Sequence, residues 1–251
     1  MKRIRRRPLS DHATQYLRGL QAEVDGASDP AAAAAALWAS RKANRAFDEI
    51  RETLKTKMAA GCERCMFCED SAGTDIEHFW PSSLYPDRAF VWENYLLACS
   101  LCNGPRYKGT NFPLDAAGDP LLLDPTADQP RRHLPLEPTT GMFVAATAKG
   151  CQTIATLGLN TREALTGRRK TSWQLVLYVI EHLSDALKVG NTFKVNAAFE
   201  LLEKPSLQCP GIISHFLEDA LRPTPKHLSP ADAAVAKFVL NETFARWRKL
   251  L

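Results

Sequence analysis

Two cysteine pairs of identical spacing are the feature of this sequence that most restricts its fold. Cys65 and Cys68 form one Cys-x-x-Cys pair, Cys99 and Cys102 form a second, and thirty residues separate them. Two such pairs supply the four thiolates of a tetrahedral structural zinc site, which stabilises small modules that have little core of their own. Cys62 precedes Cys65 at the same spacing, so the spacing alone leaves the members of the first pair open.

A redox role is the alternative reading of cysteine pairs, and the sequence gives it little support. Thioredoxin-like sites carry a single pair within a βαβ unit, and no βαβ pattern flanks either pair here. The longest apolar run, Ala31–Ala39, is far shorter than the roughly 20 residues that span a bilayer, and no apolar signal segment follows the basic N-terminus. We therefore expect a cytoplasmic protein without membrane contact, whose clustered cysteines bind metal. The isolated Cys151 and Cys209 are expected to be small buried apolar residues.

Basic residues exceed acidic ones only near the N-terminus. The net charge is +4, but five positive residues fall within the first seven, and the remaining 27 basic and 28 acidic residues nearly balance. Such an arm either contacts phosphates or remains a solvated tail, and its charge alone does not distinguish the two.

Hydrophobic periodicity, helix-breaking residues and the cysteine spacing divide the 251 residues into three parts and predict a mainly α protein with a small α+β, zinc-anchored module. Residues 1–60 form a basic N-terminal arm and helical region, residues 61–115 the zinc-anchored module, and residues 116–251 a proline-rich connector and helical C-terminal region. The individual expectations are one long or two shorter helices over Pro30–Ala60, a hairpin near Gly141, a short helix from Asn160 or Thr161 to Leu165, a helix over Thr171–Val189, and a last helix starting at Ser229-Pro230.

The residues between and after the cysteine pairs suggest chemistry. Glu77 and His78 stand together in the run Asp-Ile-Glu-His-Phe-Trp-Pro, Asn94 follows sixteen residues after His78, and Asn103 comes directly after Cys102. Each residue alone is uninformative, since a lone histidine or asparagine is more often structural. Together, an acid beside a histidine, a later asparagine and an oxygen donor after the last cysteine resemble the HNH endonuclease motif, the ββα-metal finger.

This resemblance implies a role for each of the four residues in phosphodiester hydrolysis. His78 is expected to be the general base, since an imidazole accepts a proton from water near neutral pH. Glu77 and Asn103 are expected to hold a catalytic Mg²⁺ or Mn²⁺ through oxygen, and Asn94 to orient His78. Glutamate and asparagine replace the commoner aspartate and histidine of the motif; both keep an oxygen donor.

The resemblance narrows to the HNH nuclease subunit of Septu-type and retron-associated anti-phage defence systems. It rests on the runs Cys-Met-Phe-Cys-Glu, Asp-Ile-Glu-His-Phe-Trp-Pro and Phe-Val-Trp-Glu-Asn-Tyr-Leu-Leu-Ala-Cys, then Cys-Asn with Lys108 and Asn-Phe-Pro, and it continues more weakly to about residue 170. It starts at Cys65, which favours Cys65, Cys68, Cys99 and Cys102 as the zinc ligands. It also implies an ATPase subunit as partner and DNA as substrate.

Three basic residues near the motif are expected to contact DNA phosphates: Arg88, Arg106 and Lys108. Two other functions remain open. One is a zinc ribbon that binds nucleic acid or protein without cutting, and the other is a scaffold subunit whose nuclease site has decayed. Both would have no need of the intact set of Glu77, His78, Asn94 and Asn103.

Overall fold

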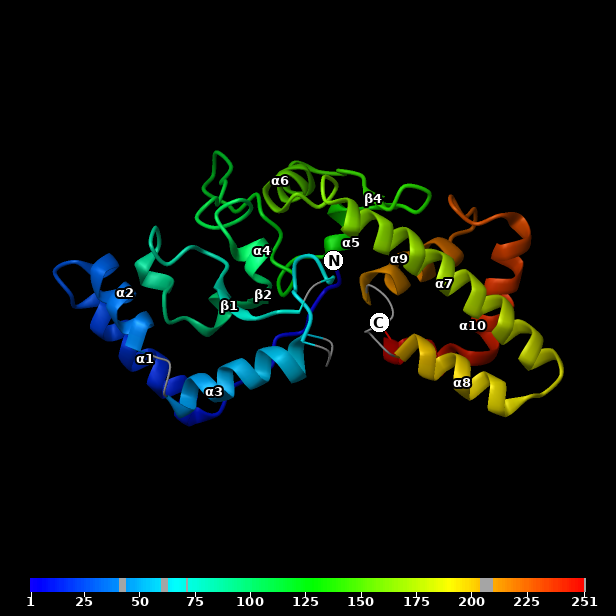
Figure 1. Cartoon of the computed structure of the whole chain (residues 1–251), viewed down its shortest axis with the longest axis horizontal. Coiled ribbons are helices and arrows are strands. Elements are labelled where there is room, and N and C mark those ends of the chain that lie inside the picture. The colour runs from blue at the N-terminus through cyan, green and yellow to red at the C-terminus, as the bar shows by residue number, and fades with distance from the viewer. Residues whose placement is uncertain (41–43, 60–62, 71, 204–209, 251) are drawn as a thin grey trace. The chain divides into compact units, whose positions relative to one another are not determined.

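The computed structural model describes the chain except residues 41–43, 60–62, 71, 204–209 and 251. The described chain divides into two compact units. Residues 3–129 and 148–158 form the first, which we call the cysteine unit, and residues 1–2, 130–147 and 159–251 form the second, the helical unit. The elements of both are labelled in Figure 1.

The cysteine unit contains short helices and one hairpin. Its elements are α1 (Asp11–Asp25), α2 (Pro30–Ser40), α3 (Arg45–Glu52) with the π-helical turn η2 (Thr53–Met58), β1 (Asp75–His78), the 3₁₀ turns η3 (Pro86–Arg88) and η4 (Trp92–Asn94), β2 (Tyr95–Ala98), α4 (Ser100–Asn103) and α6 (Ala148–Leu157). Two helices, α2 and α3, therefore lie in the predicted helical region, whereas α1 and α6 were not predicted.

Capping and apolar spacing explain where the N-terminal helices form. Ser10 caps α1 by accepting a hydrogen bond from the backbone N–H of Ala13, and Leu17, Leu20 and Val24 recur on the buried face of that helix. Asn44 caps α3 in the same way. Helix α1 packs against α2, α3 and η3, and the turn η2 that continues α3 contacts β2.

The β1–β2 hairpin is antiparallel, with Glu77 opposite Leu96 and His78 opposite Tyr95. All four residues of β2 are buried. Gly73, just before β1, lies so close to β2 that a Cβ atom there would approach the side chain of Leu97 to 2.3 Å. The hairpin therefore needs glycine at this position.

The helical unit packs three helices against one long one. Its elements are α5 (Pro130–His133), β3 (Leu136–Glu137), β4 (Met142–Phe143), α7 (Glu163–Lys188), α8 (Thr192–Glu203), α9 (Pro210–Ala220) and α10 (Pro230–Leu250). Helix α7 contacts α8, α9 and α10 (Figure 1), and its apolar stripe, including Trp173, Val176, Ile180 and Leu183, is buried as the spacing predicted.

Several sequence expectations for this unit are confirmed and some are extended. The β3–β4 hairpin turns at Gly141, whose φ is +72°, and α10 starts at Pro230 with Ser229 accepting from the N–H of Asp232. The two helices expected near 160–165 and 171–189 are one helix, α7. The sequence predicted a mainly helical chain with a small module of short elements that carries four cysteines, and the structure confirms this prediction.

One expectation is wrong: Cys151 is exposed on α6, because the buried face of that helix is formed by residues at other positions, including Thr153 and Leu157. Cys209 and Cys62 lie outside the described residues.

None of the helices in the described ranges combines the length and apolar character needed to cross a membrane.

Candidate metal and catalytic centre

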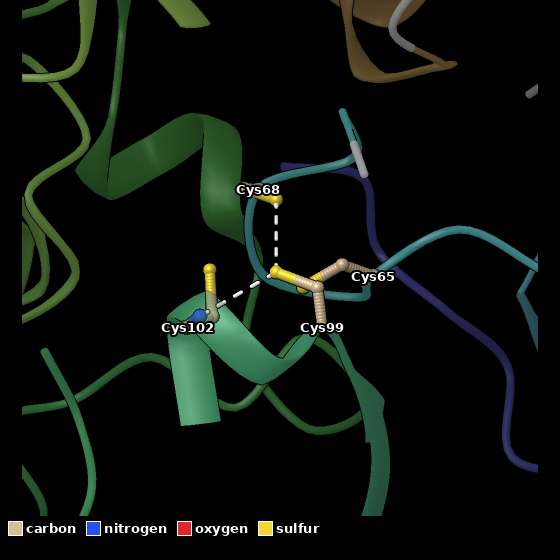
Figure 2. A group of neighbouring side chains, drawn as sticks. All are labelled: Cys65, Cys68, Cys99 and Cys102. Carbon is tan, nitrogen blue, oxygen red and sulfur yellow. Dashed lines mark hydrogen bonds between the residues drawn. The ribbon is translucent and has the colours of Figure 1, made fainter. Parts of the chain in front are cut away.

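Four buried cysteine side chains come together just beyond the end of β2 (Figure 2). The sulfurs of Cys65, Cys68, Cys99 and Cys102 lie within 4.8 Å of one another. The Sγ atoms of Cys68 and Cys99 are 3.9 Å apart, close to the roughly 3.8 Å that four tetrahedral Zn–S bonds of about 2.3 Å impose. This separation far exceeds the ~2.05 Å of a disulfide bond. The predicted four-cysteine cluster is therefore confirmed.

The chemistry of this cluster fits a structural zinc ion. Burial, reinforced by the neighbouring thiols, raises the pKa of the Cys65 thiol, so four thiolates together need a compensating cation. A divalent ion supplies that charge, and four sulfur ligands complete its tetrahedral shell. Across the described ranges, this is the one group of three or more Cys, His, Asp or Glu side chains whose ligand atoms converge.

The cluster is tied directly to the hairpin. Cys99 caps α4, since its sulfur accepts from the backbone N–H of Cys102 at 3.4 Å. The N–H of Met66 donates to the carbonyl oxygen of Leu97 at 2.8 Å, so the first cysteine turn is bonded to β2. Any ion that fixes the four sulfurs thus also fixes β2 and the strand β1 paired with it.

Glu77 faces a buried lysine. The Nζ atom of Lys108 donates to Glu77 Oε1 and to the carbonyl oxygen of His78, the second at 2.8 Å. Lys108 is 0% exposed and Glu77 5%. Burial raises the pKa of Glu77 to about 7 although the Lys108 ammonium opposes that shift, and burial lowers the pKa of Lys108. The Lys108–Glu77 pair therefore holds β1 against the segment that follows α4.

His78 lies on the opposite face of β1, since neighbouring strand residues alternate. Its Nε2 atom is 2.8 Å from the carbonyl oxygen of Ala89. A carbonyl oxygen only accepts hydrogen bonds, so Nε2 carries the proton and Nδ1 of the neutral ring keeps the basic lone pair. The ring packs against Trp38 and Tyr95, with centroid distances of 4.3 and 5.3 Å, and His78 is 8% exposed.

Asn94 binds the backbone of the loop that contains Ala89, whose carbonyl oxygen contacts His78. Its Oδ1 accepts from the N–H of Trp80 at 2.7 Å, and its Nδ2 donates to the carbonyl oxygens of Trp80 and Arg88 at 3.0 and 2.8 Å. Residue 88 immediately precedes Ala89, whose carbonyl contacts His78. Asn94 is thus placed to orient the imidazole through the backbone at residues 88 and 89.

Asn103 shares a face of the hairpin with Glu77. Its Nδ2 donates to Asp75 Oδ2 at 3.2 Å, and Asp75 lies two residues before Glu77 on β1, hence on the same side. Two carboxylates and an amide oxygen are hard donors that suit Mg²⁺ or Mn²⁺, and magnesium commonly takes few protein ligands and keeps several waters. The donor types therefore fit a hard divalent cation, which would share Glu77 with Lys108.

The three basic residues expected at DNA have different surroundings. Arg88 is half-exposed and lies over the ring of Trp80 at 4.3 Å, and Arg106 is exposed beside Tyr107. Lys108 is buried and bonded within the protein. We therefore do not propose Lys108 as a contact to nucleic acid, because its ammonium has no access to a phosphate.

The N-terminal arm is neither a phosphate-binding arm nor a free tail at Arg6. The guanidinium donates to the carbonyl oxygens of Trp92, Glu93 and Tyr95 at 2.9, 2.9 and 3.0 Å. It also lies 5.2 Å from the centre of the Trp92 ring. Arg6 therefore fixes the segment that leads from η4 into β2.

Two curated proteins resemble the chain. It is 29% identical to Septu protein PtuB of Bacillus thuringiensis over 138 residues, which cover 53% of this chain and 49% of that protein. It is 29% identical to Septu protein PtuB of Bacillus mycoides (strain KBAB4) over 166 residues, 54% of this chain and 55% of that protein. The chain is a distant homologue of Septu protein PtuB.

The resemblance to Septu-type systems read from the sequence is thereby confirmed. The chain spans about half the length of the Septu proteins it matches. No family model matches it, and no solved structure does.

Sequence reasoning missed the residues of this PtuB homologue that surround His78 and its loop. Trp38 comes from α2, which lies forty residues earlier in the chain. Gln21 of α1 accepts from the N–H of Phe90 at 2.8 Å and donates to the carbonyl oxygen of Pro86 at 3.1 Å, on either side of Ala89. Nothing in the local sequence marks these residues, because their role arises from long-range packing.

Proposed function

We propose that this chain is a metal-dependent HNH endonuclease that hydrolyses DNA phosphodiester bonds. The observation that carries the proposal is the hydrogen bond between His78 Nε2 and the carbonyl of Ala89, on a hairpin anchored by four cysteines. That bond assigns the ring proton to Nε2, so Nδ1 is the ring nitrogen with the basic lone pair that general-base catalysis needs. The distant homology to Septu protein PtuB supports the same function.

Each residue of the centre has a proposed part in the reaction. Nδ1 of His78 takes a proton from water as the water oxygen attacks phosphorus and the bond to the 3′ oxygen breaks. The released 3′ oxygen takes a proton from solvent, so the products are 5′-phosphate and 3′-hydroxyl ends. Glu77 and Asn103 would hold Mg²⁺ or Mn²⁺, which supplies charge relief at the phosphate and the leaving oxygen. Asn94 is a positioning residue, because it holds the backbone next to Ala89.

We propose that the protein binds DNA without preference for a particular base sequence. Arg88 and Arg106 are the accessible cations nearest the motif, and phosphate contacts of this kind add affinity without reading bases. The basic groups therefore favour a nuclease of broad sequence tolerance.

We propose that the protein works in anti-phage defence beside an ATPase subunit. The support is its homology to the Septu proteins. Expression together with an ATPase from a neighbouring gene should yield a stable complex on affinity purification. A chain that stays alone in that experiment and cuts DNA at full rate without the ATPase would refute the partnership.

The nuclease proposal is tested by substituting its base. His78→Ala should abolish cleavage of supercoiled plasmid in Mn²⁺ or Mg²⁺, while zinc content and melting temperature change little. His12→Ala, at an exposed position on α1, is the matched control and should cut at the wild-type rate. Undiminished cutting by the His78 variant would refute the mechanism. Cys102→Ser should instead lose zinc and unfold the cysteine unit.

A zinc-ribbon module that binds nucleic acid or protein without cutting is the second candidate. The low exposure of His78 beneath Trp38 favours it. A protein that retards DNA in a gel shift but leaves plasmid intact with every divalent cation tried would support this function over the nuclease.

A further inference from the structure

The helical unit contains a cavity that the proposed nuclease centre does not use. It has a volume of about 430 Å³, within the range of small-molecule sites. The residues that line it belong to α5, β3, α7, α9 and the loops beside them, all within this unit. Its walls include basic, imidazole and indole side chains: Arg131, Arg132, Trp173, His215, Lys226 and His227.

The acidic groups of the cavity are engaged in shaping it. Glu218 pairs with Arg131 at 3.5 Å and with Arg222 at 3.1 Å. Asp219 accepts the backbone N–H groups of Lys226 and His227, both at 2.9 Å. The third carboxylate of the lining, Glu137, accepts from the N–H and the hydroxyl of Thr139 and lies 3.9 Å from His227 Nδ1. All three carboxylates are therefore engaged within the protein, which largely satisfies their charges.

Two cations at the cavity have no such partner. Within the described ranges, no carboxylate lies within 4.0 Å of the Arg132 guanidinium or the Lys226 ammonium. Both side chains belong to exposed residues. They are thus free to turn toward a ligand that carries negative charge.

His215 supplies a third unsatisfied group, and this one is buried. Its Nε2 atom has no hydrogen-bond partner in the protein, although the residue is 8% exposed. Burial and the nearby positive charges of the N-terminal amine, Arg131 and Arg169 lower the pKa of His215 to about 3. The wall of the cavity therefore combines a vacant polar atom with a positive potential, an arrangement that favours an anion.

We propose that this cavity binds a phosphate monoester, with Arg132 and Lys226 contacting the phosphate and His215 completing its hydrogen bonds. A mononucleotide fits the volume, and the Trp173 ring on the wall suits a base. The same chemistry occurs at the 5′-phosphate end of a nucleic acid strand. This inference does not depend on the nuclease proposal.

Calorimetric titration of the full chain with AMP and with a 5′-phosphorylated oligonucleotide tests the site. We expect one ligand per chain from at least one of the two, and at least tenfold weaker binding by the variant Arg132→Ala/Lys226→Ala. Lys237→Ala, an exposed substitution on α10, is the matched control and should bind normally. Binding of AMP identifies a free nucleotide as the ligand, and binding of the oligonucleotide alone identifies a strand end.

A second measurement reports on the buried histidine without altering it. The His215 imidazole resonances, assigned by their loss in His215→Gln, should shift when the ligand is added. No binding of either probe, equal binding of the matching 5′-hydroxyl oligonucleotide, unchanged affinity in the double variant, or a static His215 signal would each overturn the proposal.

Discussion

Lys108→Met should destabilise the cysteine unit by an amount that identifies a buried ion pair. The side chains of Lys108 and Glu77 are 0% and 6% exposed. Removing one partner of a buried pair leaves an uncompensated charge and typically costs about 3–5 kcal/mol. Methionine keeps most of the aliphatic volume of lysine, so the loss reflects charge and the hydrogen bond to the carbonyl of His78. We expect the free energy of unfolding of Lys108→Met to be lower than that of the wild type by about 3–5 kcal/mol at pH 7.5.

A double-mutant cycle separates the pair from its surroundings. Glu77→Gln combined with Lys108→Met removes both charges, and we expect it to recover about 2 kcal/mol or more relative to Lys108→Met alone. Lys149→Met is the control for a partly exposed pair, because Lys149 and Asp128 are 25% and 21% exposed at 3.1 Å. That change should cost less than about 1 kcal/mol.

Urea unfolding followed by tryptophan fluorescence measures the four proteins of the cycle and the Lys149→Met control. If Lys108→Met and Lys149→Met lose the same stability, or if the glutamine substitution recovers nothing, the claim that the Lys108–Glu77 pair braces β1 is refuted. The structure predicts a clear separation of the two lysines, since Lys108 is buried and also bonds the carbonyl of His78, whereas Lys149 is partly exposed.

Four further predictions follow from the geometry. A strong zinc chelator should remove one zinc ion per chain and unfold the cysteine unit, as measured by metal analysis and circular dichroism; a metal-free protein that keeps its melting temperature would refute the structural role. Gly141→Ala should cost several-fold more stability than Gly118→Ala, because both glycines have positive φ but only at Gly141 would a Cβ meet a backbone oxygen, at 2.0 Å; equal thermal melts would contradict this. The pKa of His215 is lowered to about 3 in the folded protein, against about 6.5 in the unfolded chain. The folded state therefore binds fewer protons, so the contribution of His215 to the free energy of unfolding is constant above pH 6.5 and is lower by about 2 kcal/mol at pH 5. Between pH 7.5 and 5, the wild-type protein should therefore lose more stability than His215→Gln. Trp38→Ala should increase the rate at which diethyl pyrocarbonate modifies His78, measured by peptide mass spectrometry, and an unchanged rate would show that Trp38 does not cover the ring.

The sequence by itself determined the cysteine cluster, the helical class and several element boundaries. Two Cys-x-x-Cys pairs predict a four-thiolate site through local spacing, and the family resemblance selects Cys65 over Cys62 for the first pair. A repeat of apolar residues predicts α7 because helical periodicity is also local. The capped start of α10 at Pro230 and the turn at Gly141 follow from residue types with specific backbone preferences.

Tertiary structure alone decided which polar groups are buried and what they contact. Lys108 reads as a DNA contact in the sequence but is buried against Glu77. Arg6 reads as part of a phosphate-binding or solvated arm but binds the carbonyls before and at the start of β2. Trp38 reaches His78 from a helix forty residues away. Burial and hydrogen bonding depend on which distant segments pack together, and a short stretch of residues carries no record of that packing.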